Sequence, residues 1–329
     1  MGAGSWGTLF AKVLADAGCE VKVLGRRQEI VEAINDRHEN PDYFPGMTLP
    51  SEIRATVDAA DALAGAEFVA LAVPAQTLRA NLSVWAPVLP IDGVMISLMK
   101  GIELGTGKRM SEVIQEVADV PAERISVVSG PNLAPEIAEG QPCAAVASCA
   151  DETTAQRVQA ACMTPYFRVY TSTDVIGCEL GGAVKNVIAL CVGVTAGLGY
   201  GDNTRAMLMT RGLAEITRLG AALGADEHTF AGLAGLGDLV ASCSSPLARN
   251  RTFGEKLGRG MTVEQVIAIT EQTAEGVKSS EAVLELARKH NVEMPITEMV
   301  ASVIHHGMSI RDATTALMTR SPKPERYGV

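Results

Sequence analysis

The chain has 329 residues, of which 47% are hydrophobic and 20% charged, a balance that is typical of folded globular proteins and excludes a disordered chain. A net charge of −10 and an aromatic share of 4% disfavour binding to nucleic acid or to an anionic membrane surface. Any anionic ligand must therefore be held by a local cluster of basic side chains.

The spacing of the cysteines and of the apolar residues indicates the cellular compartment of the protein. The seven cysteines lie singly with no CxxC pair, which is typical of free thiols in a reducing cytosol and not of a disulfide framework or zinc site. The five histidines lie outside every glycine-rich or basic motif, so we expect no metal. No basic-then-apolar signal opens the chain, and its longest apolar stretch, residues 187–200, is too short and glycine-rich to span a bilayer. We expect a soluble, cytoplasmic protein without membrane insertion.

In the first half of the chain, short apolar runs alternate with segments of helical periodicity. The runs predict strands at residues 20–24, 67–73, 94–98, 125–129, 144–147 and 167–170. The segments between them predict helices at residues 8–17, 28–37, 77–89, 111–117 and 153–162. Buried strands separated by such helices imply an α/β domain with a Rossmann-like, doubly wound, mostly parallel sheet over residues 1–174. From residue 175 the pattern is helical, which predicts a second, all-α domain over residues 175–329.

The chain opens on a glycine pattern, Gly2-x-Gly4-x-x-Gly7, that runs directly into a predicted helix. Its glycines allow a tight turn, close approach of a pyrophosphate, and packing of the helix on a strand. Taken alone the pattern is weak, but βα units follow it, so it predicts dinucleotide binding by the first domain. A buried strand should precede the pattern, yet only Met1 does. We therefore expect an upstream apolar strand that this sequence omits.

The end of the predicted strand at residues 20–24 bears on the choice of cofactor. NAD-selective sites usually place an acidic residue there, whereas Arg26 and Arg27 suit the 2′-phosphate of NADP. The alternative is a solvated arginine pair that opens the next helix.

Two strand ends in the first half carry groups suited to an anionic substrate. Lys100 follows the predicted strand at residues 94–98, at the sheet edge where ligands of α/β proteins bind. A surface lysine is the plainer interpretation. Gly130, Pro131 and Asn132 follow the next strand in the same way, although proline often begins helices for structural reasons alone.

The most informative stretch surrounds Lys185. A stripe of apolar residues over 184–191 predicts a helix with a buried face, and Lys185 adjoins that face. Its neighbours one turn away, Gly181 and Ala189, are small and would leave room for a ligand beside the ammonium. An unpaired lysine is costly to bury, so a lysine beside a buried face needs a functional reason. General acid–base catalysis is the favoured one. The alternative is a lysine that reaches solvent while the glycines admit a neighbouring helix.

Two further motifs complete the predicted site. Asp238 follows a glycine-rich turn, and a carboxylate there can orient a lysine or accept a hydrogen bond from a substrate hydroxyl. Arg249 and Asn250 together suit a multidentate clamp for phosphate. A helix cap and a basic helix face are the structural alternatives.

Together these motifs resemble the bacterial NAD(P)-dependent sn-glycerol-3-phosphate dehydrogenase family. The resemblance covers essentially the whole chain in order, and its residues are Gly-Ala-Gly-Ser-Trp-Gly at 2–7, Met-Lys-Gly at 99–101, Ser-Gly-Pro-Asn at 129–132, Glu-Leu-Gly-Gly-Ala-Val-Lys-Asn at 179–186, Gly-Leu-Gly-Asp-Leu at 235–239 and Ala-Arg-Asn at 248–250. It implies reversible reduction of dihydroxyacetone phosphate to sn-glycerol 3-phosphate with NAD(P)H, for phospholipid biosynthesis, by a homodimer.

The resemblance also implies roles for individual residues. Lys185 would be the proton donor and acceptor, with Lys100 and Asp238 as catalytic partners. Cofactor contacts would come from Gly2, Gly4, Ser5, Trp6, Gly7, Arg26, Arg27, Lys100, Ala134, Arg249 and Glu275. Substrate contacts would come from Lys100, Gly130, Asn132, Lys185, Asn186, Asp238, Arg249 and Asn250. Ala248 departs from the family, which usually has a substrate-contacting serine there, and we expect a loss of about 0.5–1.5 kcal/mol in binding.

Two other functions remain open from the residues alone. A hydroxyacid dehydrogenase or ketopantoate reductase would share the two-domain architecture, but the pair Arg249 and Asn250 favours a phosphorylated substrate. A non-catalytic NAD(P)-sensing protein would need the glycine pattern but has no use for Lys185, Asp238 and the phosphate clamp together.

Overall fold

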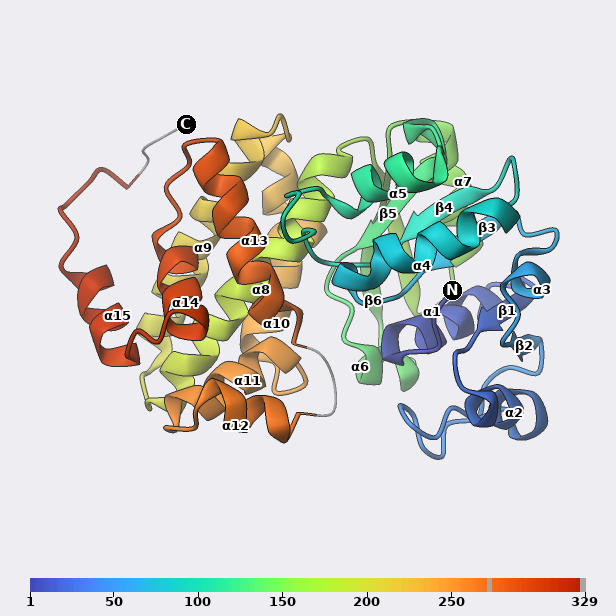
Figure 1. Cartoon of the computed structure of the whole chain (residues 1–329), viewed down its shortest axis with the longest axis horizontal. Coiled ribbons are helices and arrows are strands. Elements are labelled where there is room, and N and C mark those ends of the chain that lie inside the picture. Colours follow the sequence, from blue (N-terminus) through green and yellow to red (C-terminus); the bar gives the residue numbers. More distant parts are fainter. Residues whose placement is uncertain (271–273, 326–329) are drawn as a thin grey trace. The chain divides into compact units, whose positions relative to one another are not determined.

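The computed structural model describes residues 1–270 and 274–325 (Figure 1). The chain folds into two compact units, the first made of residues 1–99 and 110–175, the second of residues 100–109 and those from 176 onward. Residues 100–109 therefore pack with the second unit, although they lie inside the range that the sequence analysis gave to the first domain. This excursion puts Lys100 in the helical unit.

The first unit is built on parallel strands. Five strands form one sheet in chain order, namely β3 (Phe68–Leu71), β4 (Val94–Ser97), β5 (Ile125–Ser129), β6 (Cys143–Cys149) and β7 (Phe167–Ser172). Neighbouring strands of this sheet are parallel except β5 and β6, which pair antiparallel. A separate parallel pair consists of β1 (Val21–Leu24) and β2 (Ile53–Thr56). The prediction of a mostly parallel, Rossmann-type sheet is confirmed.

Met1 lies between the two groups of strands. Its amino group donates a hydrogen bond to the Ala70 carbonyl at 2.7 Å, and its carbonyl accepts one from the Ala72 amide at 3.0 Å. The next amide, that of Gly2, donates to the Leu24 carbonyl at 3.1 Å. Residues 1 and 2 thus bond to the ends of both β3 and β1, at the position where the sequence analysis expects a strand.

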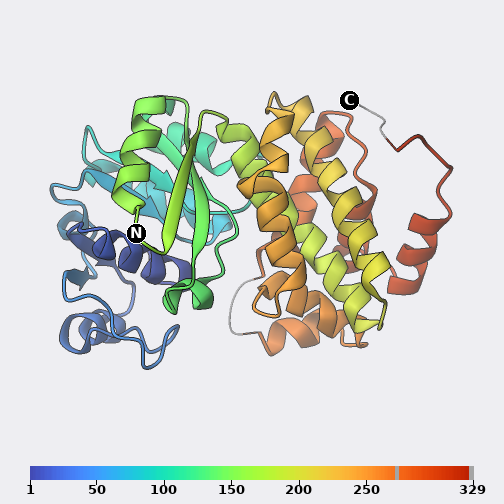
Figure 2. The same ribbon diagram turned by 180° about the vertical axis from the view of Figure 1, so that it is seen from behind.

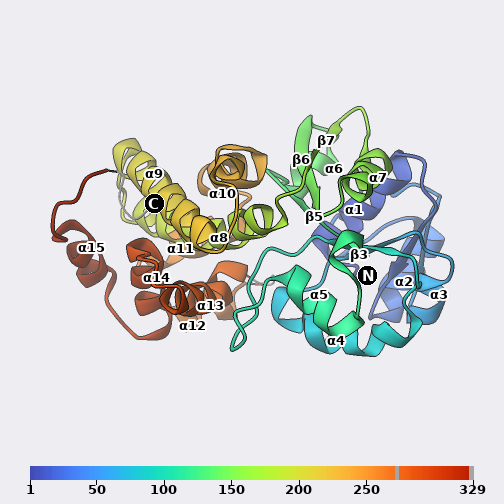
Figure 3. The ribbon, with the colours of Figure 1, turned by 90° about the horizontal axis from the view of Figure 1, so that it is seen from above.

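Helices cover both faces of the larger sheet (Figure 3). On one face, α4 (Leu78–Trp85) and α5 (Met110–Ala118) pack against Met95 of β4. On the other, α1 (Ser5–Asp16) and α7 (Glu152–Cys162) pack against the flanking residues Val94 and Ile96. This alternation follows from the two-residue period of a strand buried on both faces. The remaining helices are α2 (Gln28–Arg37), α3 (Ala59–Leu63) and α6 (Ala134–Ala138), with short 3₁₀ turns at Ala75–Thr77, Ala86–Val88 and Ala122–Arg124.

All six predicted strands and all five predicted helices of the first unit are present, with ends shifted by a few residues. The strand β2 and the helices α3 and α6 were missed. Each has only four or five residues, too few for a hydrophobic period to stand out.

The second unit is helical wherever the structure describes regular elements from residue 176 onward (Figure 2). Its helices are α8 (Val175–Gly197), α9 (Asp202–Ala222), α10 (Asp238–Ser244), α11 (Arg249–Gly258), α12 (Val263–Ala268), α13 (Glu275–Lys289), α14 (Pro295–His305) and α15 (Ile310–Met318), with a 3₁₀ turn at Glu227–Ala231 and a π-helical turn at Leu233–Gly237. The core of the unit gathers around α8.

Helix α8 is long and apolar enough to cross a membrane by length and composition, and the stretch at residues 187–200 covers only its C-terminal part and the three residues that follow it. However, 83% of the most apolar 18-residue segment of α8 is buried inside the described structure. Such burial is what the central helix of a globular unit requires, since all of its faces meet other helices.

Glycines bring α11 close to α8. A Cβ atom on Gly193 would lie 2.1 Å from the Arg251 carbonyl oxygen, and one on Gly254 would lie 2.1 Å from the Leu190 carbonyl oxygen. No larger residue fits at either position, so the two backbones pack in direct contact. This packing holds the start of α11, with Arg249 and Asn250, at a fixed distance from the middle of α8.

Candidate active site

The glycine loop of the first unit has the shape that a dinucleotide phosphate needs. Gly2 has φ +109°, and a Cβ atom on Gly7 would lie 2.1 Å from the Gly2 carbonyl oxygen, so both positions require glycine. A Cβ atom on Gly4 would instead meet nothing within 4 Å, and no side chain caps the start of α1 there. This open, uncapped helix N-terminus fits the diphosphate of a nicotinamide dinucleotide.

Other predicted cofactor and substrate residues also lie in the first unit. Arg26 and Arg27 are exposed between β1 and α2, and Arg27 forms an ion pair with Asp42. Gly130 has φ +145° at the end of β5, and Asn132 donates to the Ala144 carbonyl at 3.2 Å. Further residues predicted here are Ser5 and Trp6 in the first turn of α1 and Ala134 at the start of α6.

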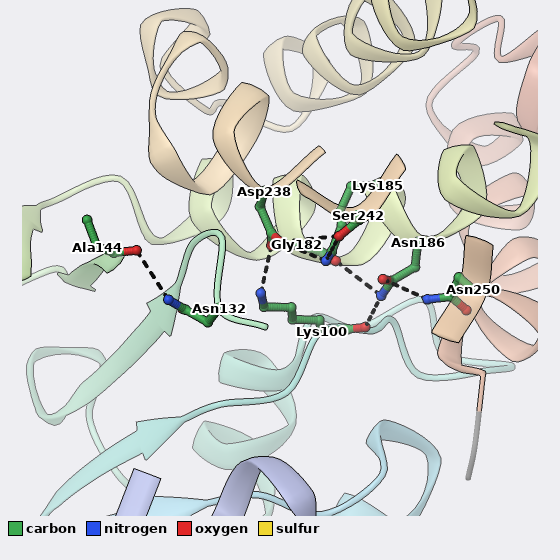
Figure 4. A network of polar contacts seen from close by, with 9 residues as sticks. All are labelled: Lys100, Asn132, Ala144, Gly182, Lys185, Asn186, Asp238, Ser242 and Asn250. Atoms are coloured by element: carbon green, nitrogen blue, oxygen red, sulfur yellow. Dashed lines mark hydrogen bonds and ion pairs between the residues drawn. The ribbon is translucent and has the colours of Figure 1, made fainter. Parts of the chain in front are cut away.

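A largely buried cluster of charged side chains in the second unit joins α8, α10 and Lys100 (Figure 4). Nζ of Lys185 lies 2.8 Å from Oδ1 of Asp238, and Nζ of Lys100 lies 2.7 Å from its Oδ2. Lys185 also donates to the hydroxyl of Ser242 at 2.5 Å. The exposed fraction is 7% for Lys185, 2% for Asp238 and 4% for Ser242. Lys185, expected beside a buried helix face, is therefore itself buried and paired with a carboxylate, so the alternative of a lysine that reaches solvent is wrong.

Two ammonium groups, those of Lys100 and Lys185, share the carboxylate of Asp238 in this cluster. Burial lowers the pKa of Lys100 to about 8, and the nearby Lys185 adds to this lowering, whereas Asp238 opposes it. Two positive charges that are largely removed from water attract an anion or a developing alkoxide strongly.

A chain of amide hydrogen bonds extends the cluster (Figure 4). Nδ2 of Asn186 donates to the Lys100 carbonyl at 3.2 Å and to the Gly182 carbonyl at 3.3 Å. Oδ1 of Asn186 accepts from Asn250 at 2.9 Å, and Oδ1 of Asn250 accepts from the Gly276 amide at 2.9 Å. The predicted residues Asn186 and Asn250 are thus joined to each other and to the start of α13, beside Glu275.

Local sequence explains how Asp238 reaches Lys185. The glycine-rich run forms a π-helical turn, Leu233–Gly237, that leads directly into α10 with Asp238 as its first residue. A Cβ atom on Gly181 would lie 2.4 Å from the Ala234 carbonyl oxygen of this turn. The expectation that Gly181 leaves room for a ligand is therefore wrong, because the space beside it is filled by backbone.

Sequence reasoning missed Ser242, which hydrogen-bonds Lys185. Ser242 comes four residues after Asp238, so the two share one face of α10, and that spacing could have identified it. Arg109 was also missed. Its Nη1 lies 2.7 Å from Oε2 of Glu179, and no local pattern marks a contact between residues 70 positions apart.

This combination of an open dinucleotide loop and a buried lysine–carboxylate cluster defines a nicotinamide-dependent dehydrogenase. The sequence matches the family description "NAD-dependent glycerol-3-phosphate dehydrogenase" in both parts, its N-terminus over residues 1–155 and its C-terminus over residues 174–315. The chain belongs to this family and is an NAD(P)-dependent oxidoreductase.

Individual relatives agree with this assignment. The "Glycerol-3-phosphate dehydrogenase [NAD(P)+]" of Streptomyces griseus is 67% identical over 325 residues, covering 99% of this chain and 97% of that protein. The protein of the same name from Thermobifida fusca is 67% identical over 330 residues, covering 100% and 98%. The crystal structure of glycerol-3-phosphate dehydrogenase from Coxiella burnetii superposes with a TM-score of 0.92 at 33% identity, over 97% of each chain.

Changing Ala248 to serine should stabilise the start of α11. Ala248 is the N-cap of this helix, and its methyl group cannot cap it, whereas a serine hydroxyl can accept from the first-turn amides. We expect the free energy of unfolding to rise by about 0.5–2 kcal/mol in urea titrations.

The same hydroxyl should lower KM for a phosphorylated substrate by about two- to tenfold, because it can add one hydrogen bond to the phosphate. Ala274, the equally buried N-cap of α13, offers a matched control, since serine there should raise stability and leave this KM unchanged. A serine at 248 that stabilises the protein without moving KM would separate capping from substrate binding and contradict the second expectation.

Proposed function

We propose that the chain reduces dihydroxyacetone phosphate reversibly to sn-glycerol 3-phosphate, with catalysis at the cluster of Lys100, Lys185, Asp238 and Ser242. The observation that carries this proposal is the pair of ammonium groups on one buried carboxylate. A ketone that accepts hydride becomes an alkoxide, and this cluster offers it both a positive charge and a proton.

Within the proposed mechanism each side chain has a separate task. NAD(P)H, when bound, supplies the hydride. Lys185 donates a proton to the carbonyl oxygen and regains it in the reverse direction. Asp238 and Ser242 hold the Lys185 ammonium in one orientation, since both contact its Nζ. Lys100, held on the other carboxylate oxygen, adds positive charge beside the same oxygen of the substrate.

The start of α11 is the proposed site for the phosphate of the substrate. Arg249 and Asn250 open this helix, and its first turn has no side-chain cap. A guanidinium, an amide and the positive end of a helix together suit a dianion. Gly130 and Asn132 of the first unit are proposed to add contacts to the substrate.

The cofactor is proposed to contact the glycine loop, Arg26, Arg27, Ala134 and Glu275. Arg26 and Arg27 permit NADP as well as NAD, because neither blocks a 2′-phosphate as an acidic residue would. We further propose a cytoplasmic homodimer that supplies glycerol 3-phosphate for phospholipid biosynthesis.

A direct assay tests the proposed substrate. When dihydroxyacetone phosphate is added to the purified protein and reduced nicotinamide cofactor, the absorbance of the reduced nicotinamide ring should fall. Loss of absorbance with a keto acid such as ketopantoate, and not with dihydroxyacetone phosphate, would favour the hydroxyacid alternative. Cofactor binding without turnover of either compound would favour a sensing protein.

The pKa of Lys100 predicts how substrate binding changes with pH. Because that pKa is about 8, the ammonium loses its proton as pH rises through this value, and attraction for the phosphate ester falls. We expect KM for dihydroxyacetone phosphate to rise by up to about fivefold from pH 8 to pH 9, as the protonated fraction of Lys100 falls. Steady-state kinetics should show the rise flattened in Lys100→Arg, whose guanidinium stays charged. A flat KM in the unchanged protein would contradict this role.

A further inference from the structure

Residues 100–109 form a closed loop that we call the strap. A backbone bridge joins Ile102 to Arg109, and the Glu103 amide donates to the Lys108 carbonyl at 2.9 Å. Gly107, with φ +67°, donates its amide to the Glu103 carbonyl at 3.0 Å. The two ends of the strap are therefore tied to each other, so that a displacement at one end moves the other.

The strap is fastened to α8 at three points. At its beginning, the Lys100 carbonyl accepts a hydrogen bond from Asn186. Ile102, fully buried, packs into the core around α8. At its end, Arg109 pairs with Glu179. Glu179 and Asn186 are seven residues apart, which is two helical turns, so the two polar fastenings lie on one face of α8.

The Arg109–Glu179 contact is partly buried. The exposed fraction of the side chain is 3% for Glu179 and 15% for Arg109, and Nη1 lies 2.7 Å from Oε2. A buried ion pair contributes little net stability, because the attraction must first offset the removal of both charges from water. What such a pair does well is to fix one arrangement of two segments, since any other arrangement breaks the contact between the two charges.

We propose that Arg109 and Glu179 are a positioning pair for catalysis: by locking the strap onto α8, they fix the Lys100 ammonium on Asp238, beside Lys185. This inference rests on the proposed catalytic roles of Lys100 and Lys185. The lysine side chain is long and flexible, so its backbone must be held if Nζ is to stay at 2.7 Å from the carboxylate. Errors of about 1 Å in such placement can cost about 10²-fold in rate.

The test is a double-mutant cycle between Arg109→Met and Lys100→Met, measured as kcat/KM for dihydroxyacetone phosphate. Alone, Arg109→Met should lower kcat/KM by about 10- to 100-fold while KM for the reduced cofactor stays within about twofold. In the Lys100→Met background the same change should cost less than about threefold, because the group it positions is gone. Equal losses in both backgrounds would overturn the proposal.

Further variants separate positioning from simple loss of structure. Glu179→Gln should reproduce the loss of Arg109→Met, and the reversed pair Arg109→Glu with Glu179→Arg should recover part of it. Arg288→Met, which breaks an ion pair between α13 and α14 with Arg288 64% exposed, should leave kcat/KM unchanged. A loss in melting temperature with unchanged kcat/KM in Arg109→Met would also overturn the proposal.

A pH profile gives an independent readout. With the strap loosened, water reaches Lys100 and its pKa should rise from about 8 toward its ordinary value of 10.5. The alkaline rise of KM should therefore move to higher pH in Arg109→Met, which a merely structural role would not cause. If the unchanged protein fails to reduce dihydroxyacetone phosphate, the proposed function fails. If it succeeds and Lys100→Met is impaired, but the cycle is additive, only this inference fails.

Discussion

Replacing Lys185 with methionine should lower kcat for dihydroxyacetone phosphate by about 10²–10⁴-fold, the range that removal of a general acid typically costs. The loss follows from the position of Nζ, which is held by Asp238 and Ser242 in a site where the lysine is 7% exposed. Among the described residues no other ammonium contacts both Asp238 and Ser242, so the alkoxide would have to take its proton from a less well placed donor or from water. Steady-state and single-turnover rates measure the loss.

The fold of this variant should persist. Methionine matches the aliphatic part of the lysine side chain, and Asp238 keeps the Lys100 ammonium as a partner, so the buried carboxylate is not left unpaired. Binding of the reduced cofactor, followed by its fluorescence, should stay within about threefold of the unchanged protein, a difference of less than about 0.7 kcal/mol. Turnover within tenfold of the unchanged protein would contradict the assignment of Lys185 as the acid.

Replacing Asp238 with asparagine should damage both stability and activity. The carboxylate is 2% exposed and neutralises part of two positive charges. Breaking a buried pair by removing one partner typically costs about 3–5 kcal/mol, and we expect a loss of this size in the free energy of unfolding at pH 7. Turnover should fall by at least about 10²-fold, because Lys185 loses the group that orients it.

The deficit of Asp238→Asn should shrink at alkaline pH. Asp238 raises the pKa of Lys100, so its removal lowers that pKa below about 8, while the unfolded value stays near 10.5. A lysine whose pKa is lowered by folding makes the folded state gain stability as pH rises through the folded pKa. Urea titrations at pH 7 and 9 should therefore show a smaller loss at pH 9. A loss below about 1 kcal/mol at pH 7 would contradict the account of the cluster.

The first unit was largely predictable because its signals are local. The strand β4 and the helix α2 were both predicted within one residue of their observed ends, since an apolar run and an amphipathic period each fill the whole element. The same reasoning missed β2, in which only Ile53 and Ala55 are buried. Two apolar residues do not make a recognisable period.

The site was predictable in its residues but not in its arrangement. Lys185 stands out because it adjoins an apolar helical stripe, and Asp238 because it follows a glycine-rich turn, and both features are local. The carboxylate of Asp238 also binds the ammonium of Lys100, which lies 138 residues away in the sequence. This contact depends on the tertiary fold, and no local pattern in the sequence indicates it. The expected space beside Gly181 failed for the same reason, because the sequence does not say whether a glycine admits ligand or backbone.

The strap shows that sequence order alone does not assign every segment to the correct unit. Residues 100–109 follow β4 directly, so sequence order placed them with the sheet. Ile102 and Arg109 instead meet partners on α8, and a single fully buried isoleucine gives no pattern that would announce this. Predictions from periodicity therefore assign regular elements well and short crossing segments poorly.

Chemical rescue tests the role of Lys185 most directly. Lys185→Ala should reduce dihydroxyacetone phosphate at least about 10²-fold more slowly than the unchanged protein, and added primary amines should restore part of the rate in proportion to the concentration of their protonated form. The amines should do nothing for Lys100→Met, which keeps its own acid. Near-normal turnover of Lys185→Ala without amine would contradict the claim that this ammonium, held by Asp238 and Ser242, is the proton donor.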